Sequence, residues 1–362
     1  MIFTSYPKIS FINNKNKITK KISSIINKGN YINSYEVNKF EKDFSKFIGM
    51  KYAASVGNAT DALFLSLKSL DISKGDKVIT VSHTATATIT AIMRTGADPI
   101  FIDIDEKDFN INLINIENKI TKNTKAIVVV HLYGQSCEMN KLIKISNKFK
   151  IPLIEDCSQC AGSFFQNKRL GSLGLISCFS FFPTKNLSTI GDGGCVLSNN
   201  NKIIKKIKSL REYGWDKSRN SMFTGINSRL DEIHAGILNI NLKNLDVYNK
   251  VRRKIANKYN EGIHNNLITL PKENDFNYHV YHHYVIRVKK RYKFLNYMKK
   301  YGFFLGIHYR LPVHKQKILK EKNYKLPITE KISKEIVSLP IYFGLKINEQ
   351  IKIIKAINSY SA

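Results

Sequence analysis

Apolar and polar positions follow two periods along the first half of the chain. Short, nearly continuous apolar runs predict buried β-strands, and the stretches between them repeat apolar residues every three or four positions, as amphipathic helices do. Strands alternating with helices indicate a mainly parallel sheet covered on both faces. The predicted strands cover residues 50–56, 77–82, 98–104, 125–134, 151–156, 177–182 and 194–199, and the predicted helices cover 59–70, 86–96, 111–120 and 139–150.

The pattern changes after Leu230. Residues 229–262 predict one long helix, residues 279–288 alternate as an antiparallel strand does, and residues 347–360 predict a last helix with an apolar stripe. We therefore expect an α/β fold with a large domain followed by a smaller C-terminal α+β domain. The expected domains are residues 1–240 and 241–362.

Composition narrows the class of protein. The chain has 362 residues and is 43% hydrophobic, so it can bury a sizeable core. No apolar run reaches the roughly 18 residues of a membrane helix, and the first residues, MIFTSYPKIS, lack the charged and apolar regions of a secretory signal. We expect a cytoplasmic protein with no membrane partner.

The five cysteines have the pattern of reduced core residues, since four lie in or beside apolar or small-residue stretches. Cys157 and Cys160 form a C-x-x-C, which could be redox-active or half of a metal site. No second C-x-x-C completes a zinc set. We interpret the cysteines as small buried residues and expect no metal.

The chain is strongly basic, with 58 Lys and Arg against 28 Asp and Glu and a net charge of +30. Nucleic-acid binding is one explanation. However, the lysines are scattered, and the chain is also rich in Asn and Ile, as a coding bias would make it. We expect no nucleic-acid partner, although a basic surface would help to attract a small anionic substrate.

Candidate chemistry lies where the predicted strands end, because ligands of open parallel sheets bind beyond the carboxyl ends of the strands. Asp156 ends one strand, Ser180 lies within another, and Lys185 follows it in the stretch FSFFPTKNLSTIGDGGC. The small-residue turn 57–60 opens a predicted helix, whose backbone N–H groups and positive dipole end suit a phosphate.

These groups match one cofactor. A lysine in a partly apolar pocket has its charged form disfavoured and becomes a usable amine nucleophile. A carboxylate at a strand end can bind a protonated ring nitrogen. A phosphate, an aldehyde and a pyridinium nitrogen together describe pyridoxal 5'-phosphate, which uses a lysine Schiff base and an acidic partner for its ring.

Several stretches resemble the sugar aminotransferases of the DegT/DnrJ/EryC1/StrS family, which are fold-type I pyridoxal phosphate enzymes. The likeness covers nearly the whole chain and implies a large domain with a seven-stranded, mainly parallel sheet. The resembling stretches are GNYINSYEVNKFEKDFSKFIG (29–49), VGNATDAL (56–63), IEDCSQCAG (154–162), SFFPTKNLSTIGDGG (180–194), GINSRLDEIHAGIL (225–238), LPVHKQ (311–316) and LPIYFGLKINEQI (339–351).

The resemblance implies roles for individual residues. Lys185 would hold the cofactor as a Schiff base and move protons as general acid and base. Asp156 would pair with the ring nitrogen, and Gln159 would contact the ring hydroxyl. The phosphate would be bound by Ser180, Thr60 and the Asn58–Ala59 turn, and by Asn227 from the partner subunit of an obligate homodimer with its active site at the interface.

Two positions depart from the family pattern. Most relatives have Gly-Thr in the phosphate turn, where this chain has Ala59-Thr60, so the turn must use an ordinary backbone conformation or hold the phosphate slightly displaced. Many relatives follow the next strand with an aromatic residue that stacks on the cofactor, and here that position is Ala85. His83 or threonine methyl groups could cover the ring instead.

Other candidates remain open between substrate contact and packing. His83, Arg229, Tyr309 and His314 could each contact the substrate, and Arg229 could equally cap the long helix. Trp215 could lie near the substrate or pack in the core. Adjacent His282 and His283 would point to opposite faces of a strand, which favours surface or packing roles over metal binding.

The resemblance implies amino transfer from L-glutamate to a nucleotide-linked 3-keto or 4-keto-6-deoxy sugar, giving an amino sugar for surface polysaccharide or glycoconjugates. Lys185 favours amino transfer over sugar dehydration, because the dehydrating branch has a histidine there. The alternatives are an aminotransferase for another keto sugar, such as an inositol or an 8-carbon sugar acid, and a non-catalytic regulator on the same fold. The intact set of acid, Gln, Ser and Lys argues against a regulator.

Overall fold

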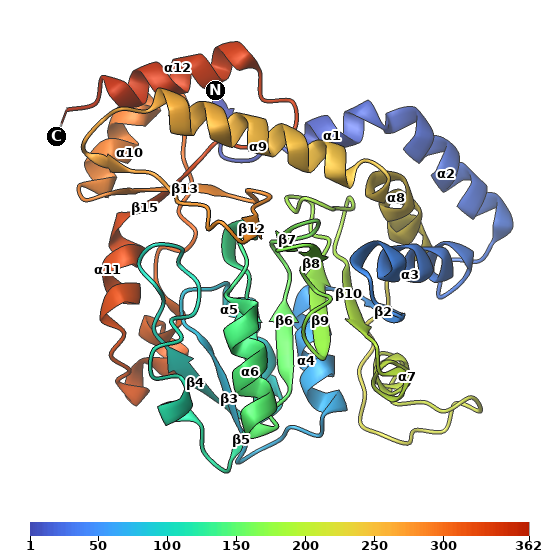
Figure 1. Ribbon diagram of the computed structural model, residues 1–362. Helices are drawn as coiled ribbons and strands as arrows, with labels where there is room; N and C mark the ends of the chain where they lie inside the picture. Colours follow the sequence, from blue (N-terminus) through green and yellow to red (C-terminus); the bar gives the residue numbers. More distant parts are fainter. Residues whose placement is uncertain (362) are drawn as a thin grey trace.

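A mixed seven-stranded sheet forms the centre of the computed structural model, which describes residues 1–361 (Figure 1). Its strands lie in the order β2–β10–β9–β6–β5–β3–β4, and β10 runs antiparallel to both of its neighbours. The prediction of a mainly parallel seven-stranded sheet is confirmed. The strands are β2 (Tyr52–Val56), β3 (Lys77–Val81), β4 (Asp98–Ile102), β5 (Thr124–Val130), β6 (Leu153–Asp156), β9 (Ile176–Ser180) and β10 (Gly194–Ser198).

Helices bury both faces of this sheet. Successive strand residues point to opposite faces, so Ile79 joins one hydrophobic cluster while Val78 joins the other. Apolar residues of α3, α6 and α8 pack in the first cluster, and those of α4, α5 and α7 pack in the second. The helices are α3 (Tyr35–Ile48), α4 (Ala59–Ser69), α5 (Thr86–Arg94), α6 (Met139–Phe149), α7 (Asn201–Leu210) and α8 (Glu232–Leu242).

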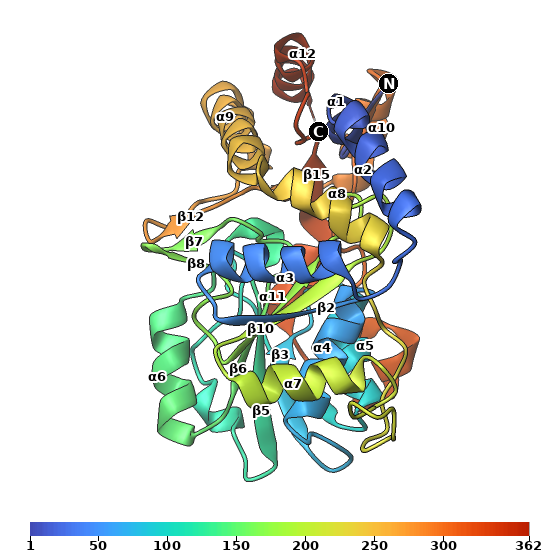
Figure 2. The ribbon, with the colours of Figure 1, turned by 90° about the vertical axis from the view of Figure 1, so that its right-hand side faces the viewer.

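A third hydrophobic cluster lies at one end of the molecule, where α9 and α12 run alongside each other above the large sheet, near the N-terminal helices (Figures 1 and 2). Its buried residues lie between positions 255 and 360 and include those of a small antiparallel sheet of order β11–β13–β15. Ile2 and Ile9 pack against it, and β1 pairs in parallel with β14. The domain boundary near residue 240 stays a prediction. The elements of this end are β1 (Ile2–Phe3), β11 (Ile268–Thr269), β13 (Tyr284–Val288), β14 (Phe303–Phe304), β15 (Ile336–Leu339), α9 (Leu245–Gly262), α10 (Arg291–Lys300) and α12 (Ile347–Asn358).

The remaining elements are short or peripheral. A three-stranded sheet of order β12–β7–β8 borders the large sheet. No helix among residues 1–361 is both long and apolar enough to cross a membrane. The further elements are α1 (Lys8–Asn13), α2 (Lys15–Lys28), α11 (Pro327–Glu335), β7 (Phe164–Phe165), β8 (Lys168–Arg169), β12 (Asn277–Tyr278) and the 3-10 turns η1 (Glu117–Lys119), η2 (Leu132–Gly134), η3 (Val313–Lys315) and η4 (Lys317–Lys322).

Two helix predictions are wrong, and in both places hydrogen bonds of asparagine residues interrupt the helical pattern. Residues 111–120 form loops and only the short η1, because Asn112 accepts a hydrogen bond from the Ile114 N–H, at 2.9 Å, in place of a helical bond. The helix predicted over 229–262 is two helices, α8 and α9. The chain turns between them where the Asn244 N–H donates to the Asn241 carbonyl, at 3.0 Å.

The strand predicted over 279–288 begins only at Tyr284. In the preceding residues the Tyr281 N–H donates to Nδ1 of His279, at 2.9 Å, and Tyr281 has a positive φ of 44°. The expectation that His282 and His283 point to opposite faces is therefore wrong. Both side chains are buried, and their ring centroids lie 4.2 Å apart.

Candidate active site

Lys185 lies in the loop between β9 and β10, at the carboxyl end of the large sheet. The loop is closed by backbone hydrogen bonds, since Phe181 donates to Gly193 and accepts from Thr189, at 2.8 and 2.9 Å. A tight turn places the Lys185 N–H on the Phe182 carbonyl, at 2.9 Å. The lysine is thus held in an ordered turn beside the end of β9.

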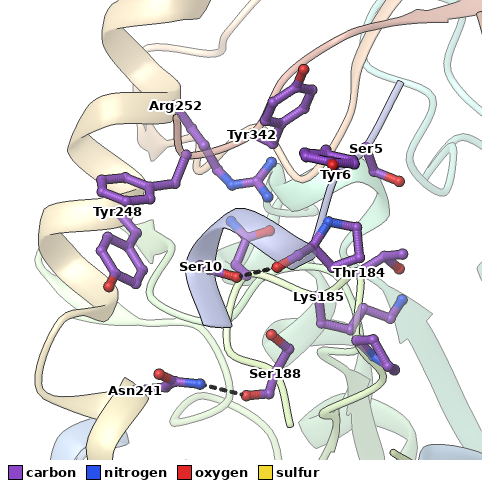
Figure 3. A pocket seen from close by; sticks show the side chains of 14 residues that line it. Ser5, Tyr6, Ser10, Thr184, Lys185, Ser188, Asn241, Tyr248, Arg252 and Tyr342 are labelled. Atoms are coloured by element: carbon purple, nitrogen blue, oxygen red, sulfur yellow. Dashed lines mark hydrogen bonds between the residues drawn. The ribbon is translucent and has the colours of Figure 1, made fainter. Parts of the chain in front are cut away.

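Two segments far apart in the sequence cover one side of this loop (Figure 3). The N-terminal segment supplies Tyr6 and Ser10, and α9 supplies Tyr248 and Arg252. Asn241 fixes the loop, because its amide donates to the Ser188 carbonyl at 2.9 Å. Lys185 itself is partly exposed and lines a pocket together with these residues.

The electrostatics of Lys185 suit a nucleophilic amine. Burial lowers the pKa of Lys185 from 10.5 to about 8, while the nearby Asp156 carboxylate and Cys160 act in the opposite direction. No hydrogen bond engages the Lys185 amine among residues 1–361. A substantial share of neutral amine is therefore present near pH 8.

Asp156 ends β6 and is only 3% exposed. Its Oδ2 accepts from the Thr88 hydroxyl at 2.8 Å, and its Oδ1 accepts from the N–H and hydroxyl of Ser158, at 3.1 and 2.6 Å. These neutral donors orient the carboxylate without neutralising its charge, so a cation placed beside it would be stabilised.

Glu155, the residue before Asp156, points to the other face of the sheet. It accepts from His131 Nε2 at 3.0 Å and from the backbone N–H groups of Gly171, Leu173 and Gly174. His131 and Glu155 lie within 4.8 Å of Cys157, a grouping that could hold a metal. Since the Cys137 N–H also donates to His131 Nδ1, both imidazole nitrogens already have protein partners, and we interpret the group as a structural network.

The phosphate turn has ordinary backbone geometry. Asn58 is extended, with φ −164° and ψ 169°, and Ala59 begins α4 without a positive φ. The Asn58 Oδ1 caps the helix by accepting from the Asp61 N–H at 2.9 Å. The first of the two alternatives raised by Ala59 therefore holds, and the side chain of Asn58 is occupied by the cap.

Several donors at this turn remain free for an anion. The N–H groups of Ala59 and Thr60 open α4 and make no hydrogen bond within residues 1–361, and neither do the hydroxyls of Thr60 and Ser180. Gly194 pairs with Ser180, and a Cβ at Gly194 would lie 2.5 Å from the Asn58 carbonyl. Glycine thus lets the turn lie directly against the sheet edge.

Gln159 follows Asp156 and is almost buried. Its Oε1 accepts from the Tyr133 N–H, and its Nε2 donates to the Tyr309 hydroxyl, both at 2.8 Å. Burial and the nearby Asp156 raise the pKa of Tyr309. The structure therefore brings Asp156, Gln159 and Tyr309 together, next to Lys185.

Other predicted residues lie apart from this group. His83 is fully buried, and its Nε2 bonds the Tyr133 hydroxyl at 2.9 Å. His314 is also buried, with Nδ1 on the Ser82 hydroxyl at 2.6 Å and Nε2 on Glu330 at 3.2 Å. Both of its ring nitrogens have protein partners in this conformation.

Asn227 and Arg229 flank Ser228, which bonds the phosphate turn. Asn227 is exposed, while its neighbour Ser228 accepts from the Gly57 N–H at 3.0 Å and donates to Asp61 at 2.8 Å. Arg229 lines an open surface pocket together with Trp215, so Trp215 is not a core residue. The substrate roles of Arg229, Tyr309, His83 and His314 stay predictions.

Sequence reasoning missed two polar residues beside the site. Thr88 bonds Asp156 and lies one helical turn from Thr84, whose hydroxyl is 3.1 Å away. Thr84 and Thr88, four positions apart in the stretch TATATITAI (84–92), were the available signal. Tyr133 makes hydrogen bonds with His83, Gln159 and the His308 carbonyl. Its backbone has a positive φ of 59°, which no feature of the sequence indicated.

The residues fit pyridoxal 5'-phosphate. The free N–H groups at the start of α4, with Thr60 and Ser180, suit its phosphate, and the Asp156 carboxylate suits a protonated ring nitrogen. Because Gly194 has no side chain, the turn at Asn58 can lie close to strand β10. Lys185, with its lowered pKa, provides the amine for covalent attachment.

Comparisons with known proteins agree with this chemistry. A dTDP-3-amino-3,6-dideoxy-alpha-D-galactopyranose transaminase of Aneurinibacillus thermoaerophilus is 42% identical over 345 residues, 95% of this chain and 95% of that protein. The crystal structure of S. venezuelae DesV in complex with a ketimine intermediate has a TM-score of 0.96 at 29% identity, covering 100% of this chain and 99% of that one.

The cofactor of a further relative has been seen directly. The crystal structure of NtdA from Bacillus subtilis, with bound cofactor PMP, has a TM-score of 0.89 at 28% identity and covers 95% of this chain and 81% of that one. The model of the DegT/DnrJ/EryC1/StrS aminotransferase family matches residues 13–358. The chain therefore belongs to the DegT/DnrJ/EryC1/StrS aminotransferase family and is an aminotransferase that depends on pyridoxal 5'-phosphate.

Proposed function

We propose that this enzyme transfers an amino group from L-glutamate to carbon 3 of a dTDP-linked 3-keto-6-deoxyhexose. The supporting observation is the 42% identity, over 95% of both chains, with a transaminase whose product carries its amino group at that carbon. Of the 3-keto and 4-keto sugars expected from the sequence, we favour the 3-keto class. The product would serve surface polysaccharide or glycoconjugate synthesis.

Each site residue has its own role in the proposed reaction. When bound, the cofactor supplies an electron sink for the carbon that bears the amino group. Lys185 would hold the cofactor and would move a proton at that carbon, for which a pKa of about 8 is well matched. Asp156, oriented by Thr88, would keep the ring nitrogen protonated, and Gln159 beside Tyr309 would hold the ring hydroxyl. The start of α4 would bind the phosphate.

We also propose that the enzyme is a homodimer in which Asn227 of each subunit reaches the phosphate of the other. In support, Asn227 is exposed and makes no side-chain hydrogen bond within residues 1–361. Large apolar side chains near the site are also exposed, among them Phe182 and Ile190 on the Lys185 loop and Phe223 before the GINSR stretch. A second subunit would cover them.

A cytoplasmic location is part of the same proposal. All five cysteines are free thiols and are buried, as expected for a reducing compartment. This observation supports the location independently of the substrate.

A panel of nucleotide keto sugars tests the substrate. The purified enzyme is incubated with 3-keto and 4-keto-6-deoxy sugars on dTDP and UDP, with an inositol ketone and with an 8-carbon keto acid, each with L-glutamate, L-glutamine or L-alanine. Products are identified by mass and NMR. We expect the fastest turnover with the dTDP-linked 3-keto sugar and glutamate, and turnover of only the inositol or the keto acid would contradict the proposal.

Absorbance separates an enzyme from a regulator. The purified protein should show a yellow band that borohydride bleaches, and Lys185→Ala should lack the covalent band. A colourless wild-type protein that gains no band when cofactor is added would favour the regulatory alternative.

A further inference from the structure

The start of α5 leaves one face of the cofactor site without an aromatic side chain. Ala85 contributes only a methyl group there. His83 cannot turn toward the site, because it is fully buried between Tyr133 and Phe109 and is bonded to the Tyr133 hydroxyl at 2.9 Å. The Thr88 hydroxyl is engaged by Asp156 at 2.8 Å.

A segment from the C-terminal part of the chain, residues 309–316, is attached to the residues on either side of Ala85. The Val313 N–H donates to the Ser82 carbonyl at 3.2 Å, and the backbone N–H of His314 donates to the Ser82 hydroxyl at 3.0 Å. Farther along, Gln316 bonds the Thr86 hydroxyl at 3.4 Å. The segment is therefore attached on both sides of Ala85.

Tyr309 is the aromatic residue of this segment that reaches the site. Its hydroxyl accepts from Gln159 Nε2 at 2.8 Å, and Asp156 is close enough to contribute to the raised pKa of the phenol. Gln159 and Asp156 are the two residues assigned to the rim of the cofactor ring. Tyr309 therefore lies beside the position of that ring.

The backbone before Tyr309 is held from three sides. The His308 carbonyl accepts from the Tyr133 hydroxyl, and Nδ1 of the His308 ring bonds the Ser338 hydroxyl at 2.9 Å. The His308 ring also stacks on His283, with centroids 3.8 Å apart and an interplanar angle of 15°. These contacts fix where the Tyr309 side chain begins, so its ring does not need to be ordered when the cofactor binds.

We propose that Tyr309 supplies the aromatic surface against the cofactor ring that Ala85 does not provide. The inference rests on the proposed placement of the ring between Asp156 and Gln159. An electron-rich phenol ring is well suited to lie against a protonated, electron-poor pyridine ring. The chain would thus obtain its aromatic contact with the ring from residue 309, outside the large sheet and its helices.

Cofactor affinity of the apoprotein tests this role without reference to turnover. The protein is stripped of cofactor and titrated with pyridoxal phosphate, and binding is followed by absorbance and by circular dichroism of the cofactor band. Tyr309→Leu should weaken binding about tenfold, whereas Tyr309→Phe should stay within about threefold of wild type because it keeps the ring. The exposed Tyr301→Leu is the control and should bind as wild type does.

A compensating substitution sharpens the test. Ala85→Phe combined with Tyr309→Leu should recover most of the lost affinity, because the aromatic surface returns from the other side. Equal affinity of Tyr309→Leu and wild type would overturn the inference, as would a loss in Tyr309→Phe as large as that in Tyr309→Leu. Failure of Ala85→Phe to restore binding would also overturn it.

A fluorescent variant guards against a folding defect in Tyr309→Leu. Trp215 is the single tryptophan, so Trp215→Phe with Tyr309→Trp places the only indole at the site. Its emission should be strongly quenched when the cofactor binds, and unchanged emission would overturn the inference. If wild-type apoprotein binds no cofactor at all, the proposed function itself fails, so the two failures are distinguishable.

Discussion

Two regions of the molecule differ in how their residues are held. The strand-end group comprises Lys185, Asp156 and the start of α4, and the histidine-rich segment comprises residues 279–283 with His308, which stacks on His283. At the strand ends, Lys185 has a free amine and the start of α4 has free N–H groups. Around His283 and His308, the two imidazole rings stack on one another and the His308 side chain bonds the Ser338 hydroxyl. The first region keeps its polar groups available for a ligand, whereas the second uses them to hold position.

The comparison predicts different phenotypes for the two regions. Substitutions at the strand ends should alter chemistry and cofactor binding with little loss of fold stability. Substitutions in the histidine-rich segment should alter stability and its pH dependence first. The following predictions, from the largest expected effect to the smallest, test that division.

Lys185→Ala should lower amino transfer by roughly 10³-fold or more, because it removes both the attachment point and the proton carrier. The urea midpoint of the apoprotein should stay close to wild type. Exposed Lys168→Ala serves as the control and should keep full activity. Retained turnover in Lys185→Ala would contradict the role of the lysine, and a collapsed fold would break the comparison.

Asp156→Asn should lower the rate by about 10²-fold, because the ring nitrogen loses its charged partner. The carboxylate opposes the effect of burial on Lys185, so its removal should also move the pKa of Lys185 below about 8. The pH dependence of cofactor attachment, followed by absorbance, measures this shift. Asp246→Asn, which breaks the ion pair with Arg169, should leave that profile unchanged.

Acid should destabilise the fold through its buried histidines. Burial lowers the pKa of His83 to about 4 and that of His308 to about 4, while the unfolded chain takes up these protons below about pH 6.5. Stability is therefore greatest above pH 6.5 and falls as the pH drops toward 4. His308 alone should cost roughly 2 kcal/mol at pH 5.

Urea unfolding at pH 7.5 and pH 5 measures the acid effect. His308→Gln, which keeps a possible partner for the Ser338 hydroxyl, should reduce the difference between the two pH values, whereas exposed His264→Gln should not. Equal stability of the wild-type protein at both pH values would show that the histidines do not titrate as buried groups.

Asn58→Ala should cost about 1 kcal/mol of stability, because it removes the cap of α4. It should also weaken cofactor binding severalfold by loosening the phosphate turn. Asn200 caps α7 in the same way, so Asn200→Ala should show the stability loss alone. If both variants bound cofactor equally well, the turn at Asn58 would not be the phosphate site.

The strand-end region could be predicted well from the sequence, because the apolar pattern identifies each strand and the parallel order places the strand ends at one edge. Apolar runs identified the strands, and the parallel order placed Asp156 and Lys185 at one edge. The histidine-rich segment was mispredicted because its geometry depends on long-range contacts. The alternation in HVYHHYVIRV resembles a strand, yet His279 bonds the Tyr281 N–H and the chain bends.

The same reasoning explains why Tyr309 could not be assigned from the sequence. Its place depends on the contacts that Ser338, His283 and Tyr133 make with His308, and these residues lie far apart in the chain. The absence of an aromatic residue at position 85 is visible in the sequence, but the residue that fills the gap is visible only in the fold.

The pairing of β1 with β14 bears on how the C-terminal part could be produced. Ile2 and Phe3 lie alongside Phe303 and Phe304, and the Ile341 N–H donates to the Thr4 carbonyl at 3.2 Å. A fragment spanning 241–362 would lack this strand and leave an apolar edge open to self-association. Adding a synthetic peptide of the first ten residues to that fragment should therefore raise its solubility.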